Sequence, residues 1–380
     1  MTIKLYENDA YLKEFEATVV SCEECKNGYL ITLDKTAFFP EGGGQQADCG
    51  FINDAKVIDV QEKSGIITHK VNKAFEIGET VLCKLDWDTR FARMQGHTGE
   101  HLVSGIIHSM FGYDNLGFHM SDKTMTLDPN GLLSAEDIKE IELRANKAVY
   151  ENREITAYYP EASALDTLDY RSKLDLKEGV RLVSIDGYDL CACCAPHVHR
   201  TGEIGLIKII DFIQYKGGMR LTMVCGINAF EDYSKLHDDS KEMMHLLSAS
   251  RDKVLDFVTR DHETIGAQKA EINRLSAEIA KANLDIKLIG STLCGFTKGA
   301  SFDDMRNMVN ERLNEAQIVA FFSESENDTF SYIISSAASD VRDLVKALNE
   351  AFCGKGGGRP NYAQGKITAN KDSILKFFEN

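Results

Sequence analysis

The stretch GHTGEHL, residues 96–102, decides much about this sequence because it carries two histidines four residues apart. The residues that follow keep an apolar period of three to four, which predicts a helix. On a helix, His97 and His101 lie on the same face, close enough to share a metal ion. Two half-buried histidines that only form hydrogen bonds would have the same spacing, so the pair alone does not decide between these interpretations.

A second cluster about ninety residues later favours the metal site. The segment CACCAPHVH, residues 191–199, repeats the spacing of four between Cys193 and His197. Thiolate sulfur and imidazole nitrogen are the ligands that zinc prefers. Cys191 and Cys194 leave the identity of the thiolate ligand open, although the spacing favours Cys193. The sequence thus predicts one zinc site with ligands from two distant segments: His97, His101, Cys193 and His197.

Length and composition bound the class of protein. The chain has 380 residues, of which 43% are hydrophobic and 27% are charged, and these values are typical of a globular protein with two or three domains. No apolar run is long enough for a membrane span. The N-terminus shows no secretory leader, and the 10 Cys are then expected to be reduced thiols and metal ligands. A cytoplasmic protein is the expectation.

Short β-segments separated by turns fill the first ninety residues and predict a small barrel over 1–90. Between them lies PEGGGQQ, residues 40–46. Consecutive glycines lose much conformational entropy on folding, so they mark either a tight turn with a bulge or a loop whose backbone approaches a ligand. In the second interpretation, the substrate pocket is lined by Thr36, Gly42, Gly43, Gly44, Gln45 and Gln46.

Alternating strands and helices over 91–228 predict an α+β region that carries the metal ligands, and 291–380 alternates again. Between them, 229–290 is charged and helical, with apolar residues three and four apart, as in the seam of a coiled coil. Two helices of one chain could share this seam, but a homodimer is favoured. The fold class is therefore α+β with several domains. The clearest part of the seam is Ile272, Leu275, Ile279, Ala282, Ile286 and Ile289.

A second glycine-rich stretch, GKGGGRP at residues 354–360, follows a predicted helix. The net charge of −16 argues against broad non-specific binding of nucleic acid, but not against a local basic groove. A helix C-cap with a flexible turn is one interpretation. The favoured one is a backbone nest that binds phosphate with the help of nearby cations. Its residues are Lys355, Gly356, Gly357, Gly358 and Arg359.

Taken together, PEGGGQ at 40–45, HTGEH at 97–101 with its Cys–His partner pair, and GKGGGRP at 354–360 resemble the editing and C-terminal parts of alanyl-tRNA synthetase. More closely, they resemble the freestanding alanyl-tRNA editing proteins of the AlaX type, in the long form. The resemblance covers nearly the whole chain. It implies a zinc-containing editing domain over 91–228 and a C-terminal α/β domain like DHHA1, for tRNA binding and dimerisation, over 291–380.

The activity that this resemblance implies is hydrolysis of the ester that links serine, or glycine, to alanine tRNA. The synthetase's aminoacylation domain should precede the barrel, yet the chain starts at Met1, so ATP binding follows by analogy only and charging of tRNA is not expected. The family often has Cys-Gly-Gly-Thr-His where this sequence has CCAPH at 193–197. No general base is identified; the candidates are Glu100 and His119. With four protein ligands, zinc would be closed to water, as in structural sites.

Two other functions remain open from the sequence. HTGEH also fits the inverted zinc-protease motif, in which Glu100 would be the base and a distal residue such as Glu178 would complete the site. That interpretation leaves the Cys–His pair and both glycine-rich stretches unexplained. In the second alternative, zinc stabilises a non-catalytic module that only binds tRNA.

Overall fold

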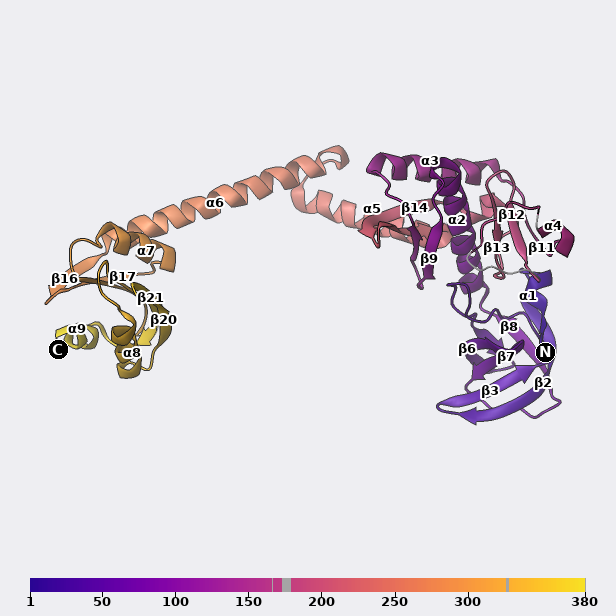
Figure 1. Ribbon diagram of the computed structural model, residues 1–380, viewed down its shortest axis with the longest axis horizontal. Helices are drawn as coiled ribbons and strands as arrows, with labels where there is room; N and C mark the ends of the chain where they lie inside the picture. Colours follow the sequence, from indigo (N-terminus) through magenta and orange to yellow (C-terminus); the bar gives the residue numbers. More distant parts are fainter. Residues whose placement is uncertain (166, 173–178, 326–327, 380) are drawn as a thin grey trace. The chain divides into compact units, whose positions relative to one another are not determined.

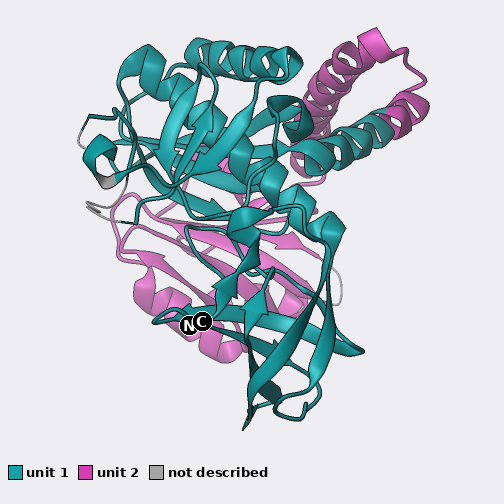
Figure 2. Ribbon diagram, turned by 90° about the vertical axis from the view of Figure 1, so that its right-hand side faces the viewer, with its two compact units in different colours: residues 1–240 teal, residues 241–380 magenta. Residues whose placement is uncertain are grey.

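The computed structural model describes residues 1–165, 167–172, 179–325 and 328–379. Two compact units make up the chain, residues 1–240 and 241–380 (Figure 2). None of the helices in the described ranges is long and apolar enough to cross a membrane.

Six strands of unit 1 close into a barrel in the order β2-β3-β7-β6-β5-β8 (Figure 1). In the last strand, Val81, Cys83 and Leu85 alternate with exposed residues, so one side of the strand faces the barrel core. The barrel strands are β2 (Glu14–Cys25), β3 (Gly28–Leu33), β5 (Gly50–Ile52), β6 (Ala55–Lys63), β7 (Ile66–Val71) and β8 (Thr80–Leu85). The same part of the chain holds β1 (Ile3–Lys4), α1 (Leu5–Asn8) and β4 (Lys35–Thr36).

A long helix, α2 (Trp87–Phe111), follows the barrel directly. The side chain of Asp86 accepts a hydrogen bond from the Thr89 amide at its start, and Gly112 ends it in the left-handed conformation with φ of 69°. Within the helix, a Cβ atom on Gly99 would clash with the Cys225 sulfur of strand β15. Glycine therefore lets the helix lie close to the sheet that packs against it.

Two sheets and a second helix complete unit 1. The four-stranded sheet has the order β14-β15-β10-β9, and the three-stranded sheet has the order β11-β12-β13. Their strands are β9 (Asn115–Met120), β10 (Met125–Pro129), β11 (Ile155–Tyr158), β12 (Leu182–Ile185), β13 (Asp189–Ala192), β14 (Ile207–Tyr215) and β15 (Gly218–Cys225). Helix α3 (Ala135–Glu151) begins with a capping box between Ser134 and Asp137. The short helices are α4 (Ala162–Leu165) and η1 (Thr201–Ile204).

A buried ion pair fixes α2 to the barrel. Arg90 pairs with Asp48, and both side chains are 1% exposed. The same guanidinium donates hydrogen bonds to the carbonyl oxygens of Ala10 and Ala37. Three barrel segments are thus held by one side chain in the first turn of the helix.

Unit 2 is built on a six-stranded sheet of order β16-β17-β18-β19-β21-β20. Neighbouring residues of strand β18 face different cores: Phe321 packs on one face of the sheet and Phe322 on the other. The strands are β16 (Asp285–Ile289), β17 (Thr292–Lys298), β18 (Ile318–Glu324), β19 (Thr329–Ser335), β20 (Lys355–Arg359) and β21 (Tyr362–Thr368). The helices are α7 (Phe302–Glu311), α8 (Arg342–Ala351) and α9 (Lys371–Glu379).

The helical segment between the sheets is shorter than the sequence predicts. Helix α5 (Gly226–Leu247), the single turn η2 (Arg251–Lys253) and α6 (Val254–Ala282) follow one another. The predicted seam was therefore wrong at its end: Ile286 and Ile289 belong to strand β16 and pair with Gly295 and Thr292. The spacing of these apolar residues continues the period of the preceding helix. Hydrogen bonding to the neighbouring strand nevertheless decides their structure.

The glycine-rich stretch after α8 is also not a loop. Residues Lys355–Arg359 form strand β20, which pairs antiparallel with β21 at the edge of the sheet. Glycine is unfavourable inside strands, so the sequence predicted a turn.

Candidate metal centre

The first pair of predicted ligands lies on α2, about one turn apart. His97 and His101 are both 3% exposed, and their ring centroids are 5.3 Å apart. Because residues at i and i+4 share a helix face, both rings point to the same side.

The second pair comes from the irregular segment after strand β13. The Nε2 atom of His197 lies 3.4 Å from the Cys193 sulfur, and that sulfur lies 3.7 Å from Nε2 of His97. One ligand atom from each of the four predicted residues lies within 4.8 Å of the others. The structure thus brings the predicted set together, and Cys191 and Cys194 lie outside that set.

Each histidine of the cluster is oriented by a hydrogen bond at its Nδ1 atom. The pairs are His97 with Gln45 at 2.8 Å, His197 with Thr98 at 3.0 Å and His101 with Asp189 at 3.2 Å. Partners of this kind fix the tautomer and direct the other ring nitrogen at a metal. Sequence reasoning missed Thr98 and Asp189 as partners, because an outer hydrogen bond has no spacing signature.

A second group of metal-ligand types, His101 with Asp189 and Cys191, overlaps the first. Arg171 donates two hydrogen bonds to the Asp189 carboxylate, at 2.7 and 2.9 Å. The carboxylate is therefore neutralised by a cation and serves as support for the His101 ring.

The charge state of the cluster suits a metal ion. Burial alone would raise the pKa of the Cys193 thiol, but the neighbouring His97 and His197 hold it well below its usual value. Burial lowers the pKa of His197 to about 3. Burial also acts to lower the pKa of His101, but the Cys191 charge and the hydrogen bond to Asp189 hold it above its usual value. A thiolate with neutral imidazoles is the donor set of zinc sites, and any proton on His101 leaves on binding.

The first glycine-rich stretch is a tight turn that touches this cluster. Gly43 and Gly44 both have positive φ, 59° and 84°, and the backbone of Gly42 and Gln45 closes the turn with two hydrogen bonds. A Cβ atom on Gly44 would clash with Phe118, whose ring centroid lies 4.8 Å from that of His97.

Gln45 is the pocket candidate that reaches the cluster. Its Oε1 atom accepts from His97, while its Nε2 atom is buried and has no partner among the described residues. Its neighbour Gln46 accepts a hydrogen bond from Arg93, one turn before His97 on α2. Consecutive glutamines thus hold consecutive turns of the helix.

Thr36 lies inside the barrel. Its hydroxyl is 2.9 Å from Nε2 of His69 and accepts a hydrogen bond from the Phe38 amide at 3.1 Å. Burial lowers the pKa of His69 to about 4, so the ring is neutral at neutral pH. The Thr36 hydroxyl is therefore engaged within the core.

The two candidates for a general base differ in their surroundings. The buried Glu100 accepts hydrogen bonds from Ser104 and Asn115, both at 2.5 Å. Burial alone would raise its pKa, but His101 and the bond from Ser104 lower it. His119 is exposed on strand β9 and follows Phe118, which faces His97, so the His119 side chain points to the other side of the sheet.

The protease interpretation gains no support from this geometry. Its base, Glu100, is occupied by two hydrogen bonds, and the Cys–His pair takes the remaining ligand positions. The proposed third residue, Glu178, lies outside the described residues.

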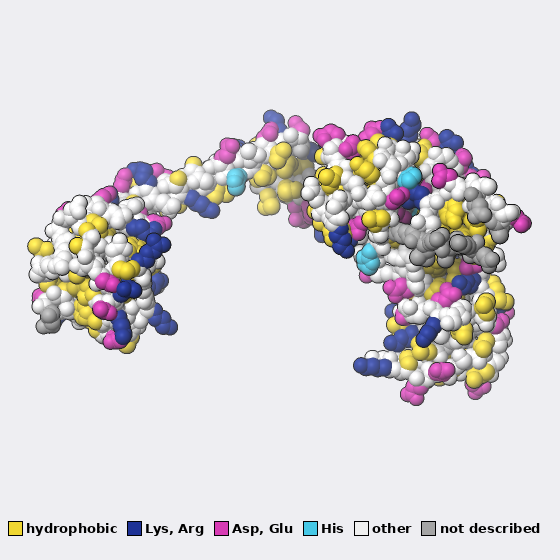
Figure 3. All heavy atoms as spheres, in the orientation of Figure 1, with side chains coloured by type: hydrophobic (Ala, Val, Ile, Leu, Met, Phe, Trp, Pro, Cys, Tyr) yellow, Lys and Arg dark blue, Asp and Glu magenta, His cyan; other side chains and the backbone are white. Residues whose placement is uncertain are grey.

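The candidate phosphate-binding residues all lie on the exposed edge strand β20. Cavities of about 430 and 580 Å³ lie beside it, and both are lined by Gly357 and Gly358. Arg342 and Lys346 line the first cavity, and Arg306 and Arg359 the second. Figure 3 shows Lys and Arg side chains gathered on one side of unit 2.

Two of the three glycines of β20 have a packing role. A Cβ atom on Gly356 would clash with Tyr332, and one on Gly358 would clash with the backbone of Tyr362. A Cβ atom on Gly357 would meet nothing within 4 Å. Packing therefore explains the outer two glycines and leaves the middle one open to a ligand.

Three family models match parts of the chain. They are "tRNA synthetases class II (A)" over residues 6–89, "Threonyl and Alanyl tRNA synthetase second additional domain" over 180–225 and "DHHA1 domain" over 285–380. The second match ends at the last residue of β15 and includes Cys193 and His197.

Similar proteins cover nearly all of the chain. Alanyl-tRNA editing protein AlaX-L of Pyrococcus horikoshii is 28% identical over 99% of this chain and 97% of its own length. Alanine–tRNA ligase of Pyrococcus abyssi is 31% identical over 96% of this chain, and that of Ignicoccus hospitalis is 33% identical over 74%. The matches span 42% and 33% of the two ligases, so this chain corresponds to less than half of each.

Proposed function

We propose, on the premise that this chain is a relative of the long-form alanyl-tRNA editing proteins, that it is an aminoacyl-tRNA deacylase acting on mischarged alanine tRNA. Its substrates would be seryl-tRNA(Ala) and glycyl-tRNA(Ala). The observation that carries the proposal is the cluster of His97, His101, Cys193 and His197 beside the glycine turn. Because charged tRNA is used at the ribosome, the proposal also implies a cytoplasmic protein.

The metal that fits these residues is zinc, since thiolate and imidazole are its preferred donors and the four ligand atoms lie within 4.8 Å of one another. When bound, zinc would supply a positive charge beside the ester carbonyl; because four protein ligands would fill a tetrahedral ion, either water takes the place of one ligand or the ion only organises the 3′ end of the tRNA. The chain's own residues hold that charge in place through the bonds from Gln45, Thr98 and Asp189. Water then adds to the carbonyl carbon, the bond to the ribose oxygen breaks, and that oxygen takes up a proton.

Selection of serine is assigned to Gln45. Its buried Nε2 can donate to the serine hydroxyl oxygen, and an alanyl group would leave this donor unpaired. An unpaired buried donor costs about 1–3 kcal/mol, which is enough to favour the wrong amino acid over the right one. Gln46 then supports the pocket through its hydrogen bond with Arg93, and the Thr36 hydroxyl stays engaged in the barrel core. The hydroxyl argument does not extend to glycine.

Four segments of the chain have different roles in this proposal. Residues 1–90 form the barrel that presents the glycine turn, and 91–228 hold the metal cluster. The helical residues 229–282 join two copies, and residues 285–380, which include strand β16, bind tRNA.

The decisive experiment compares seryl-tRNA(Ala), glycyl-tRNA(Ala) and alanyl-tRNA(Ala) as substrates, with a peptide as a fourth. We expect release of serine at least about tenfold faster than release of alanine. Binding of tRNA without release of any amino acid would support the non-catalytic module instead. Peptide cleavage would favour the protease.

The edge strand β20 is assigned to the tRNA backbone. Replacing Lys355 and Arg359 with alanine is expected to weaken tRNA binding. The slope of log binding constant against log salt concentration should become smaller by up to about 1.8. Gly357→Ala is expected to weaken binding as well, because its Cβ would occupy open space at the strand. The measurement is a binding titration at several salt concentrations.

A matched control for this assignment is Lys371→Ala, which removes a cation of the same unit that is paired with Asp285. Its salt dependence should match that of the parent protein. An unchanged slope for the Lys355 and Arg359 variant would remove β20 from the tRNA interface.

A stripe of apolar side chains on α6, formed by Ile272, Leu275 and Ile279, is assigned as the contact surface of a homodimer. Ile272, Leu275 and Ile279 are exposed by 61%, 43% and 57%, although they repeat with the spacing of a coiled-coil seam. Ile272→Glu with Ile279→Glu is expected to convert a dimer into a monomer in sedimentation equilibrium. Asn273→Glu, on the same helix but outside the stripe, should leave the dimer intact. A parent protein that sediments as a monomer would refute this assignment.

A further inference from the structure

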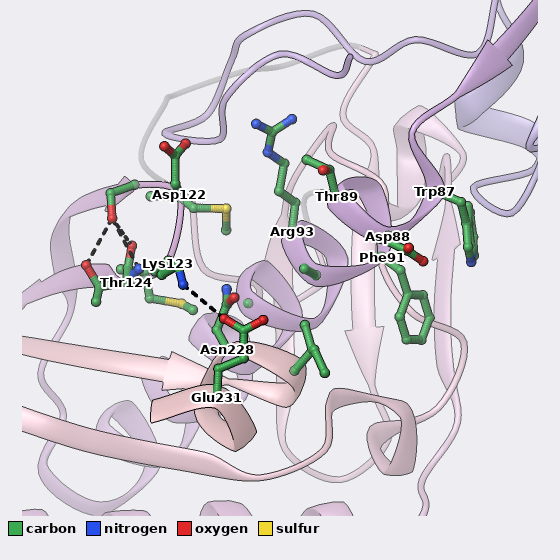
Figure 4. Close-up of a pocket in the computed structure, with 16 residues that line it drawn as sticks. Trp87, Asp88, Thr89, Phe91, Arg93, Asp122, Lys123, Thr124, Asn228 and Glu231 are labelled. Carbon is green, nitrogen blue, oxygen red and sulfur yellow. Dashed lines mark hydrogen bonds and ion pairs between the residues drawn. The ribbon is translucent and has the colours of Figure 1, made fainter. Parts of the chain in front are cut away.

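A cavity of about 770 Å³ lies in unit 1 against the N-terminal half of α2 (Figure 4). It is lined by the first turns of that helix, the turn between β9 and β10, and the start of α5. Its size is that of a small-molecule site. Gly96, which lines it, precedes the metal ligand His97 in the chain. None of the assignments above uses this cavity.

Arg93 is the cation of the cavity that lies closest to the metal ligands along the helix. It precedes His97 by four residues, so the two side chains share a face and their Cα atoms are about 6 Å apart along the axis. Its Nη1 atom donates to the Ala47 carbonyl at 2.6 Å, and its Nη2 atom donates to Gln46 at 3.1 Å. In Figure 4 the guanidinium extends from α2 beside Thr89.

Arg93 has no ion-pair partner among the described residues. Among the described residues, no carboxylate lies within 4.0 Å of its guanidinium, whereas Lys123 of the same cavity pairs with Glu231 at 3.0 Å. A guanidinium has five N–H donors, and the glycine turn uses two of them. In the described part of the chain the other donors have no hydrogen-bond partner, and they can bind an anion.

The remaining groups of the cavity lie on two sides of α2. Asp88 and Asp122 are exposed carboxylates that can accept hydrogen bonds from ribose hydroxyls. Trp87 and Phe91 pack against each other with ring centroids 5.6 Å apart, and Tyr11 and Lys13 cover the Trp87 ring, so these rings belong to the packing around the start of α2. In Figure 4 the Asp122 carboxylate lies on the same side of α2 as Arg93, whereas Trp87, Asp88 and Phe91 lie on the other side, so Arg93 and Asp122 are the polar groups that face one part of the cavity.

We infer that this cavity receives the single-stranded acceptor end of the tRNA and that Arg93 binds the phosphate of the terminal nucleotide, whose ribose carries the ester. This inference rests on the proposed function. One turn of the chain holds both contacts, since Gln46 binds Arg93 and Gln45 binds His97. The anion contact and the metal cluster are therefore held in a fixed spacing, and that spacing positions the ester.

Binding of uncharged RNA tests this without relying on hydrolysis. The probe is a hairpin with the acceptor stem of alanine tRNA and its single-stranded 3′ end, compared with the same hairpin cut flush. Arg93→Gln is expected to bind the first hairpin about tenfold more weakly, with a slope against log salt concentration smaller by about 0.7. Binding of the flush hairpin should not change. In deacylation, KM should rise about tenfold with kcat nearly unchanged.

Two further variants separate charge from structure. Lys208→Gln removes a cation of the same unit that is already paired with Glu142 and does not line the cavity, and it should bind RNA like the parent protein. Arg93→Lys keeps the charge and should restore the salt slope. Metal content of Arg93→Gln should equal that of the parent.

The inference is overturned if Arg93→Gln keeps the parent's affinity and slope, or if Arg93→Lys fails to restore the slope. Loss of metal together with affinity would also overturn it, because Arg93 would then act only by holding the glycine turn. A parent protein that binds the hairpin in the expected way but hydrolyses no ester would refute the deacylase proposal and leave this contact standing.

Discussion

Replacing Cys193 with serine is expected to release the bound metal and to slow deacylation more than about 100-fold. The thiolate is the only anionic ligand of the cluster, and His97 and His197 both lie against it. Mutation of a residue that only hydrogen-bonds to a metal ligand usually lowers metal affinity or activity by about 10- to 100-fold. Loss of a direct ligand should therefore lower the rate by more than about 100-fold. Metal analysis of the parent protein should find about one zinc per chain, and of the variant almost none.

Cys194→Ser is the matched control for that experiment. The residue is next in sequence, exposed and outside the cluster, so zinc content and rate should remain at parental levels. Full activity of Cys193→Ser, or of metal-free parent protein, would remove the metal from the chemistry.

Replacing Arg90 with methionine is expected to lower the free energy of unfolding of unit 1 by about 3–5 kcal/mol. The substitution leaves the carboxylate of Asp48 buried without its partner, and an uncompensated buried charge is among the largest penalties of a single substitution. Trp87 is the only tryptophan of the chain and lies one turn from Arg90, so its fluorescence reports unfolding of this unit in urea.

Two control variants test whether the lower free energy of unfolding of Arg90→Met comes from the buried ion pair. Lys84→Met removes an exposed cation that pairs with Glu14 at the barrel surface, and it should cost less than about 1 kcal/mol. The double variant Arg90→Met with Asp48→Leu should be more stable than Arg90→Met alone, because no charge is left unpaired. A loss of less than about 1 kcal/mol in Arg90→Met would show that the pair does not hold the helix to the barrel.

The parts of the site that sequence predicted are those with a spacing rule. Two residues four apart on a helix share a face, so the sequence alone predicts that the side chains of His97 and His101 point to the same side. Cys193 and His197 followed from donor chemistry, and the structure puts their ligand atoms beside those of the first pair.

The parts that sequence did not predict depend on contacts between distant segments. Arg171 supports Asp189, which supports His101, and no local pattern links these three positions. Strand β20 is a strand because β21 pairs with it, against the preference of its glycines. Ile286 joins β16 for the same reason, although its period matches the preceding helix.

The glycine turn joins two properties that could have been separate. Gln45 accepts a hydrogen bond from the candidate metal ligand His97 through one end of its amide, and in the proposed function the other end selects the amino acid. In the proposed function, a substitution of Gln45 that changes which amino acid is accepted also removes the hydrogen bond that orients His97, and metal binding becomes weaker. Under the proposed function, a change of substrate preference therefore has to begin elsewhere than at this glutamine, or pass through variants that bind the metal poorly.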